Sequence, residues 1–294
     1  MKCNLCPRNC GVDREKGEKG FCNMPDEVYV ARASLHMWEE PCISAEEGSG
    51  TVFFSGCNLR CVYCQNRKIS TGETGKSVTV ERLAEIFLEL QKKGANNINI
   101  VTGVHYADKI KEALCVAKKN GLAIPVVYNT SGYESVETLK MLEDCVDIYL
   151  TDFKYIEKES ATKYSKAPDY VEVVKKATDE MVRQKPEVIF DERGIATSGV
   201  IVRHLILPGM DKQSKEIIKY LYERYNDKIF MSLMNQFTPL SGLESFPEIN
   251  RKITDGEYES VIDYAVSIGV ENAYIQEGET QNESFIPDFN CDGI

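Results

Sequence analysis

The chain has 294 residues, 43% hydrophobic and 28% charged, a globular balance and a length that suits one barrel-sized domain with a small appendage. Its 35 basic and 46 acidic residues give a net charge of −11, which argues against general nucleic-acid binding, because that affinity comes from neutralising phosphates. The sequence has no apolar run of roughly 20 residues that would span a membrane, and no apolar signal-peptide core near its start. We therefore expect a cytoplasmic protein without membrane association, whose eleven cysteines bind metals or clusters rather than form disulfides.

The first 25 residues differ in composition from the rest of the chain. They carry four cysteines with the spacing C-x2-C-x3-C-x11-C, namely Cys3, Cys6, Cys10 and Cys22. Because the segment has few large apolar side chains, it cannot bury a core of its own and needs a metal centre to order it. Four thiolates fit structural zinc or a second [4Fe–4S] cluster, and the spacing does not separate the two. A reduced, disordered tail is the third alternative.

Strands and helices alternate from about residue 51 onward. The expected strands cover 51–54, 97–101, 124–128, 147–151, 199–206, 229–233 and 272–276. The expected helices cover 81–93, 106–119, 134–143, 169–184, 212–225 and 255–268. This alternation predicts βα units around a parallel sheet. About seven units favour a full or partial (β/α) TIM-type barrel over a doubly wound sheet. We expect an N-terminal Cys-rich segment and lead-in over 1–48, and a barrel domain with a C-terminal tail over 49–294.

Polar side chains follow several of the expected strands directly. They include Asn129 and Ser131, Asp152 with Lys154, Arg203 with His204, Asn235 with Gln236, and Gln276. The carboxyl ends of barrel strands carry the active site in enzymes of this architecture. A single polar loop is explained as well by helix capping, but five in the same position favour a site.

The first strand leads into the motif C-x3-C-x2-C, formed by Cys57, Cys61 and Cys64. A [4Fe–4S] cluster usually takes four cysteine ligands, so three leave one iron open to a substrate. A structural zinc site would need a fourth cysteine or histidine at short range, and none follows this motif. The spacing therefore favours a catalytic cluster over the two alternatives, a structural zinc site and three buried cysteines without a ligand.

With Tyr63 before its last cysteine, the motif resembles the signature of the radical SAM superfamily. The resemblance extends to the pyruvate formate-lyase activating enzyme-like group and its PflX-type branch. It rests on segments along nearly the whole chain, namely 36–42, 54–57, 129–133, 149–155, 203–209 and 287–289. It implies that S-adenosylmethionine (SAM) chelates the open iron and is cleaved to a 5′-deoxyadenosyl radical that abstracts hydrogen. The protein then orients the cofactor and excludes competing reactions.

The resemblance also implies roles for the strand-end residues. Lys154, in a D-x-K strand with Asp152, corresponds to the lysine that reaches the SAM carboxylate. Asn129 and Ser131 correspond to a strand end that hydrogen-bonds the ribose, and Arg203 to an arginine near cofactor or substrate. These roles agree with the chemistry of the groups, because SAM offers a carboxylate and ribose hydroxyls.

The segment Val101–Tyr106 departs from the superfamily pattern, because the acid of the usual G-G-E-P-type strand end is absent. Backbone carbonyls and Thr102 remain as acceptors for the SAM amino group. His105 has two interpretations of equal standing. It is either an acid, base or substrate contact in the site, or a capping or surface residue.

We expect a radical SAM oxidoreductase that acts on a protein or peptide, such as a glycyl radical enzyme, and takes electrons from a flavodoxin- or ferredoxin-type donor. One alternative is radical modification of a nucleotide or small molecule. Another, of a different class, is a non-catalytic iron–sulfur or zinc module.

Four further cysteines and two neighbouring glutamates complete the set of candidates. Cys115 and Cys145 lie in or beside apolar helical patterns and are expected in the core. Cys42 and Cys291 are either hydrogen-donating thiols or inert. Glu39 and its neighbour Glu40 are expected to form a solvated pair, with a position facing the barrel as the alternative.

Overall fold

The computed structural model describes residues 2–276 and 288–294. Its sheet contains seven parallel strands, which follow one another in space in the order of the sequence. They are β2 (Ser49–Phe54), β4 (Ile98–Val101), β5 (Val126–Thr130), β6 (Ile148–Asp152), β8 (Ala196–Leu205), β9 (Phe230–Met234) and β10 (Ala273–Ile275). A doubly wound sheet reverses its strand order, and this one does not. The expected α/β partial barrel is therefore confirmed.

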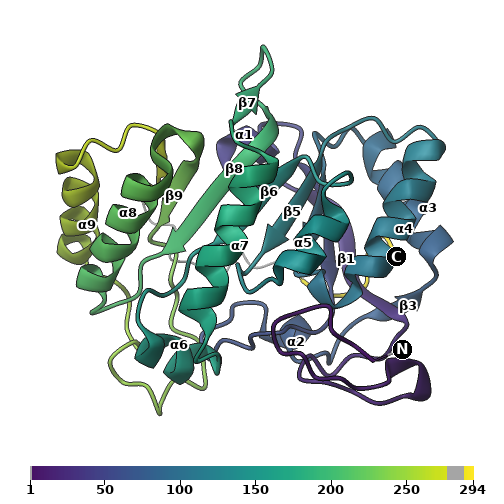
Figure 1. The fold of residues 1–294 in the computed structure, drawn as a ribbon, viewed down its shortest axis with the longest axis horizontal. Coiled ribbons are helices and arrows are strands. Elements are labelled where there is room, and N and C mark those ends of the chain that lie inside the picture. The colour runs from purple at the N-terminus through teal and green to yellow at the C-terminus, as the bar shows by residue number, and fades with distance from the viewer. Residues whose placement is uncertain (1, 277–287) are drawn as a thin grey trace.

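Six helices connect these strands and lie around the outside of the sheet in Figure 1. They are α3 (Val80–Lys92), α4 (Ala107–Lys119), α5 (Val136–Leu142), α7 (Tyr170–Gln184), α8 (Asp211–Tyr225) and α9 (Asp255–Ser267). Polar side chains cap the amino ends of several of these helices and so determine where the helices begin. Thr79 and Ser135 cap α3 and α5, and Thr254 forms a capping box with Glu257 at α9. Among the described residues, no helix has both the length and the apolar character needed to cross a membrane.

Several elements were not predicted from the sequence. At one edge of the sheet, β1 (Val28–His36) pairs antiparallel with both β2 and β3 (Lys76–Val78), and β7 (Ile189–Phe190) pairs with β8. The short helices are α1 (Pro41–Ser44), α2 (Arg67–Ser70) and α6 (Lys158–Ser165), with 3-10 turns at Arg14–Lys16, Val104–Tyr106 and Asn226–Lys228. The division of the chain at residue 48 stays a prediction, and β1, which precedes it, joins the main sheet.

The two ends of the barrel differ. At the amino ends of the strands, Cys42 and Ile43 of α1 pack against Val127, Ile148 and Leu150 in a buried apolar cluster. Figure 1 shows α1 and β7 at this end, whereas α2 and the N-terminal segment, in purple, lie at the opposite end. The carboxyl ends of the strands therefore face the cysteine loop and the N-terminal segment.

Candidate active site

The central cysteines lie on the loop between β2 and α2. The backbone N–H of Leu59 donates to Cys57 Sγ over 3.3 Å, and the Ser165 hydroxyl donates to Cys61 Sγ over 2.9 Å. Burial raises the pKa of all three thiols, to about 12 for Cys64. A bound metal must therefore displace their protons.

The arrangement of these thiols fits a cluster. No three His, Cys, Asp or Glu side chains within 2–276 and 288–294 converge closely enough to hold a single metal ion. Three half-buried cysteines on one loop, with an N–H donor at Cys57 and an O–H donor at Cys61, provide the kind of thiolate ligands that a cluster takes.

A charged network occupies the neighbouring strand ends. Asp152, the last residue of β6, accepts from Lys154 Nζ over 2.6 Å and from Arg203 Nε over 2.9 Å. Arg203 also donates to Asn129 Oδ1 over 2.6 Å and to Glu39 Oε2 over 3.2 Å. The structure thus brings together four residues that the sequence singled out on three different strands.

Electrostatics keep this network ionised and place it near the cysteines. Burial opposes ionisation of Asp152, yet Arg203 and Lys154 hold the pKa of its carboxyl below the usual value. Burial raises the pKa of Cys61, and the ammonium of Lys154 is the largest opposing influence. Lys154 therefore lies within electrostatic reach of the cysteine loop, with its side chain 16% exposed.

The expectation of a solvated Glu39–Glu40 pair is wrong. Both side chains are buried, and burial raises the pKa of both carboxyls. The chain turns inward after β1, so that Glu39 accepts hydrogen bonds from Asn99 and Asn129 inside the barrel. The alternative of a barrel-facing position therefore holds for Glu39, and the sequence could not favour it because the partners come from β4, β5 and β8.

A pocket of about 280 Å³ opens beside this network. It is lined by Trp38, Glu39, Glu40 and Pro41, by Arg203, by Ser232, Met234 and Gln236 after and within β9, and by Tyr274, Ile275 and Gln276. It therefore connects the charged network with the side of the barrel where β10 forms the edge of the sheet.

Three other predicted cofactor contacts lie around the same strand ends. Thr102 has a left-handed φ of 57°, and its N–H donates to the Asn129 carbonyl over 2.9 Å. The Ser131 carbonyl accepts from the Tyr170 hydroxyl. The buried Tyr63 hydroxyl lies 2.7 Å from that of Tyr155.

Tyr155 continues this chain to Ser165, which donates to Cys61. Ser165 is a functional candidate that the sequence analysis missed, because a serine at the end of α6 carries no motif. Its position at a thiol became visible only from the structure.

His105 takes a different position from the charged network. Its Nε2 lies 2.7 Å from the Ser55 carbonyl, and burial lowers its pKa to about 3. The side chain is 1% exposed and lines a cavity with the N-terminal cysteines. It is therefore no surface residue, and its proposed role in the site stays untested.

The remaining cysteines divide by burial. Cys145 is buried, as expected for a core residue, but Cys115 is exposed, so the prediction for it was wrong. Cys115 lies on the solvent side of α4, where an apolar pattern is not required. Cys42 is buried at the end of the barrel where the amino ends of the strands lie, and Cys291 is half-buried.

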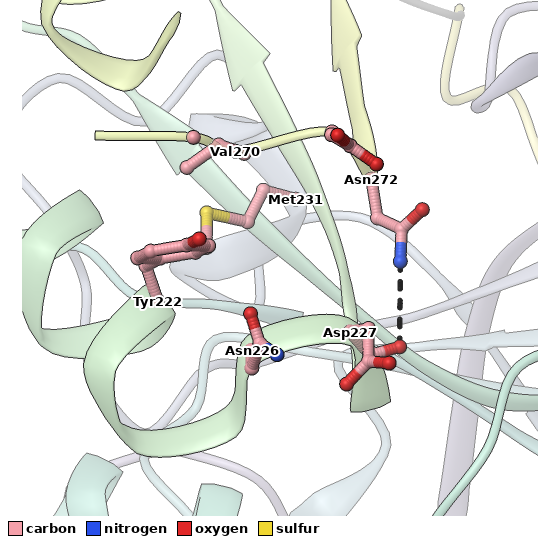
Figure 2. A pocket seen from close by; sticks show the side chains of 8 residues that line it. Tyr222, Asn226, Asp227, Met231, Val270 and Asn272 are labelled. Atoms are coloured by element: carbon pink, nitrogen blue, oxygen red, sulfur yellow. Dashed lines mark hydrogen bonds between the residues drawn. The ribbon is translucent and has the colours of Figure 1, made fainter. Parts of the chain in front are cut away.

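A second pocket, of about 270 Å³, lies far from this chemistry in the fold. Figure 2 shows Tyr222, Asn226, Asp227 and Met231 around it, with Asn272 donating to the Asp227 carbonyl over 3.4 Å. These residues end α8 and precede or begin β9 and β10, so the pocket lies at the amino ends of the strands. Barrel active sites lie at the other end.

The sequence profile of the radical SAM superfamily matches residues 51–221, which include the cysteine loop and the strand ends from β4 to β8. The chain belongs to this superfamily. Membership implies a [4Fe–4S] cluster and SAM, and a radical SAM reaction.

The relatives are themselves uncharacterized. The chain is 30% identical over 282 residues to the uncharacterized protein MJ0674 of Methanocaldococcus jannaschii, covering 92% of this chain and 76% of that protein. It is 26% identical to MJ0808 of the same organism, covering 52% of this chain and 49% of that one. Among solved structures, SuiB of Streptococcus suis matches with a TM-score of 0.50 and 12% identity, over 79% of this chain and 49% of SuiB. The likeness to SuiB concerns the fold alone.

Proposed function

We propose that this radical SAM enzyme belongs to the activating-enzyme-like group, in its PflX-type branch, and abstracts hydrogen from a protein or peptide. The observation that carries the proposal is the network of Asp152, Lys154, Arg203 and Asn129 beside the cysteine loop. A non-catalytic carrier module has no need of a buried, charged strand-end site of this kind.

Cys57, Cys61 and Cys64 would hold the cluster and leave one iron for SAM. When bound, the two cofactors supply a 5′-deoxyadenosyl radical that abstracts a hydrogen atom from the substrate. The protein's task is to bind, orient and shield. Lys154, fixed by Asp152, offers an ammonium for the SAM carboxylate.

Asn129 and Ser131, at the end of β5, offer polar groups for the ribose hydroxyls. Thr102 lies beside Asn129, and its hydroxyl and backbone carbonyl offer acceptors for the SAM amino group. Arg203 faces the pocket beside the network and would position cofactor or substrate.

The open side of the barrel supports a protein or peptide as the substrate. Trp38 is 65% exposed and Ile275 is 43% exposed, and both line the pocket that reaches Arg203. Exposed large apolar side chains at the mouth of a pocket are typical of a surface that contacts another chain. The net charge of −11 disfavours a nucleic acid there.

The first experiment tests the chemistry. The protein is purified without oxygen, reconstituted with iron and sulfide, and mixed with SAM and dithionite, and 5′-deoxyadenosine is measured. We expect product from the wild type and none from Cys57→Ala. A wild type that is fully loaded with iron and yields no product would contradict catalysis and favour the carrier module.

The second experiment tests the substrate class. Candidate glycyl radical enzymes are incubated with the reduced enzyme and SAM, and their glycyl radical is measured by electron paramagnetic resonance (EPR). A radical on the partner supports activation. Hydrogen abstraction only from a nucleotide or small molecule would overturn the protein-substrate proposal while leaving the radical chemistry intact.

A further inference from the structure

The four N-terminal cysteines surround one cavity. Cys3, Cys6, Cys10 and Cys22 line it together with Arg8, Arg14 and His105. Cys3 N–H donates to the Val12 carbonyl, and Gly11 N–H donates to the Cys3 carbonyl, so that the segment folds back on itself. Residues up to nineteen positions apart in the sequence thus present their thiols to a common space.

The backbone around these thiols resembles that of the catalytic loop, by which we mean the loop between β2 and α2 that carries Cys57, Cys61 and Cys64. Burial raises the pKa of Cys6 and Cys22, and the backbone N–H groups of Arg8 and Met24, two residues after each cysteine, oppose that rise. Leu59 N–H does the same for Cys57. Such N–H to sulfur bonds stabilise thiolates that ligate metal.

The backbone holds the Cys10 side chain in a comparable way. Phe21 N–H donates to Cys10 Sγ over 3.3 Å. A Cβ at Gly20 would lie 2.8 Å from the same sulfur, so only glycine leaves Cys10 in place.

The four thiolates alone fit either zinc or a [4Fe–4S] cluster. Zinc has no redox chemistry, whereas a cluster exchanges electrons. The contact of this segment with the catalytic loop therefore favours the redox-active centre.

The cavity also touches the catalytic loop. A Cβ at Gly56, the residue before Cys57, would lie 3.0 Å from the Cys22 carbonyl, so the two loops are in van der Waals contact. Arg8 Nε donates to the Asn58 carbonyl over 2.7 Å.

His105 connects the same two places. Its Nε2 bonds the Ser55 carbonyl, two residues before Cys57, while its buried Nδ1 has no hydrogen-bond partner among the described residues. The ring lines the four-cysteine cavity, where a bound centre gives Nδ1 a neighbour.

The four thiols run from the surface inward. Cys10 is exposed, whereas Cys22, next to Gly56, is buried. A redox centre here is therefore accessible to a carrier protein on one side and adjoins the catalytic loop on the other.

We propose that Cys3, Cys6, Cys10 and Cys22 hold a second [4Fe–4S] cluster that relays electrons to the catalytic one. One electron leaves a reduced low-potential carrier protein, reduces the N-terminal cluster from 2+ to 1+, and then passes to the catalytic cluster while the first returns to 2+. The relay rests on the proposed function, but the presence of the cluster does not.

Metal content of a variant that lacks Cys57, Cys61 and Cys64, all changed to Ala, tests the cluster. We expect about four iron and four sulfide per chain, an EPR signal on reduction and no zinc, against about eight iron in the wild type. The control is Cys115→Ala, an exposed cysteine outside both sets, which should keep the wild-type content. One zinc and no iron, or neither metal, would overturn the proposal.

Gly20→Ala provides a second variant that retains all the cysteines. It should lose about half of the wild-type iron while the catalytic EPR signal remains. If iron content is full and the EPR signals of both clusters are unchanged, Gly20 is not needed to position Cys10 as a ligand, which would contradict this part of the proposal.

The relay is tested with Cys10→Ser, a near-isosteric change at an exposed position, and the folding of the variant is checked by thermal unfolding. Formation of 5′-deoxyadenosine driven by reduced flavodoxin should fall at least about tenfold, and that driven by dithionite should fall less. Equal rates with flavodoxin would overturn the relay. A wild type with eight iron and no product would instead overturn the proposed function and leave the second cluster standing.

Discussion

Two cysteine sets lie side by side at the carboxyl end of this barrel, and they differ in what surrounds them. The catalytic set has three thiols, a donor hydroxyl from Ser165 and the nearby charge of Lys154. The N-terminal set has four thiols, faces Arg8 and Arg14, and reaches the surface at Cys10. A missing fourth thiol leaves an open metal position for chemistry, whereas a complete set closes it and leaves only structure or electron transfer.

The largest expected effect separates the two sets by activity. Cys61→Ala should abolish SAM cleavage with dithionite, because the catalytic cluster loses one of three ligands. Cys6→Ala should leave cleavage measurable, because its cluster only supplies electrons. The assay is 5′-deoxyadenosine formation by each reconstituted variant, and equal loss in both would mean that the two sets act as one site.

The second prediction concerns the positive charge of Lys154, which lies near Cys61 of the catalytic set. Lys154→Met should weaken SAM binding about thirtyfold, as expected when one member of a buried charge pair is removed at about 2 kcal/mol. Lys154→Arg, which keeps the positive charge next to Asp152, should lose less. Equilibrium binding of SAM to the loaded protein measures both, and unchanged affinity in the methionine variant would remove Lys154 from the cofactor site.

The third prediction concerns His204, the residue after Arg203 in β8. It is that the free energy of unfolding depends on pH through this side chain. His204 Nδ1 donates to the Phe153 carbonyl and Nε2 accepts from the Ser214 hydroxyl, each over 2.8 Å. Burial lowers the pKa of His204 from 6.5 to about 4. Below pH 6.5 the unfolded chain takes up a proton that the folded protein refuses until about pH 4, so stability falls as the pH is lowered through this window.

At pH 5 this loss should be about 2 kcal/mol of unfolding free energy. Urea unfolding at pH 7 and pH 5 measures it, with His204→Gln as the variant that cannot titrate. If the wild type and the variant lose the same stability between the two pH values, His204 is not the group responsible.

The smallest expected effect concerns the hydroxyl that only the catalytic set has. Ser165→Ala removes the O–H donated to Cys61 and should lower SAM cleavage about tenfold and shift the potential of the catalytic cluster. Tyr155→Phe is the matched control, because it removes the next hydroxyl and leaves the Ser165 donor. A redox titration followed by EPR checks both, and identical potentials in all three proteins would contradict a tuning role.

Much of the fold followed from the sequence because its signals are local. Apolar periodicity and polar strand ends predicted the seven parallel strands and the six helices to within one to three residues. Parallel topology then placed Asn129, Asp152 and Arg203 at one end of the sheet. The antiparallel pairing of β1 was missed, because its partners β2 and β3 are fixed by long-range contacts and a bulge near Val30 interrupts the register.

The parts of the site that the sequence did not predict depend on tertiary burial. A barrel-facing Glu39 was only the second interpretation, because its three partners lie on distant strands. Arg14 belongs to the N-terminal segment and was not singled out from the sequence. It is buried, donates to the Pro25 and His105 carbonyls, and stacks on Tyr106. No local sequence pattern predicts that a charged side chain will be buried and hydrogen-bonded between two segments of the chain.

The exposure of Cys10 also sets an order of damage in air. Cys10 is exposed whereas Cys57, Cys61 and Cys64 are half-buried, so oxygen reaches the N-terminal centre more readily and that centre would be lost first. Protein isolated aerobically would then keep only the inner iron and pass for an enzyme with a single cluster. Handling history, rather than sequence, would decide how many clusters a spectroscopist counts.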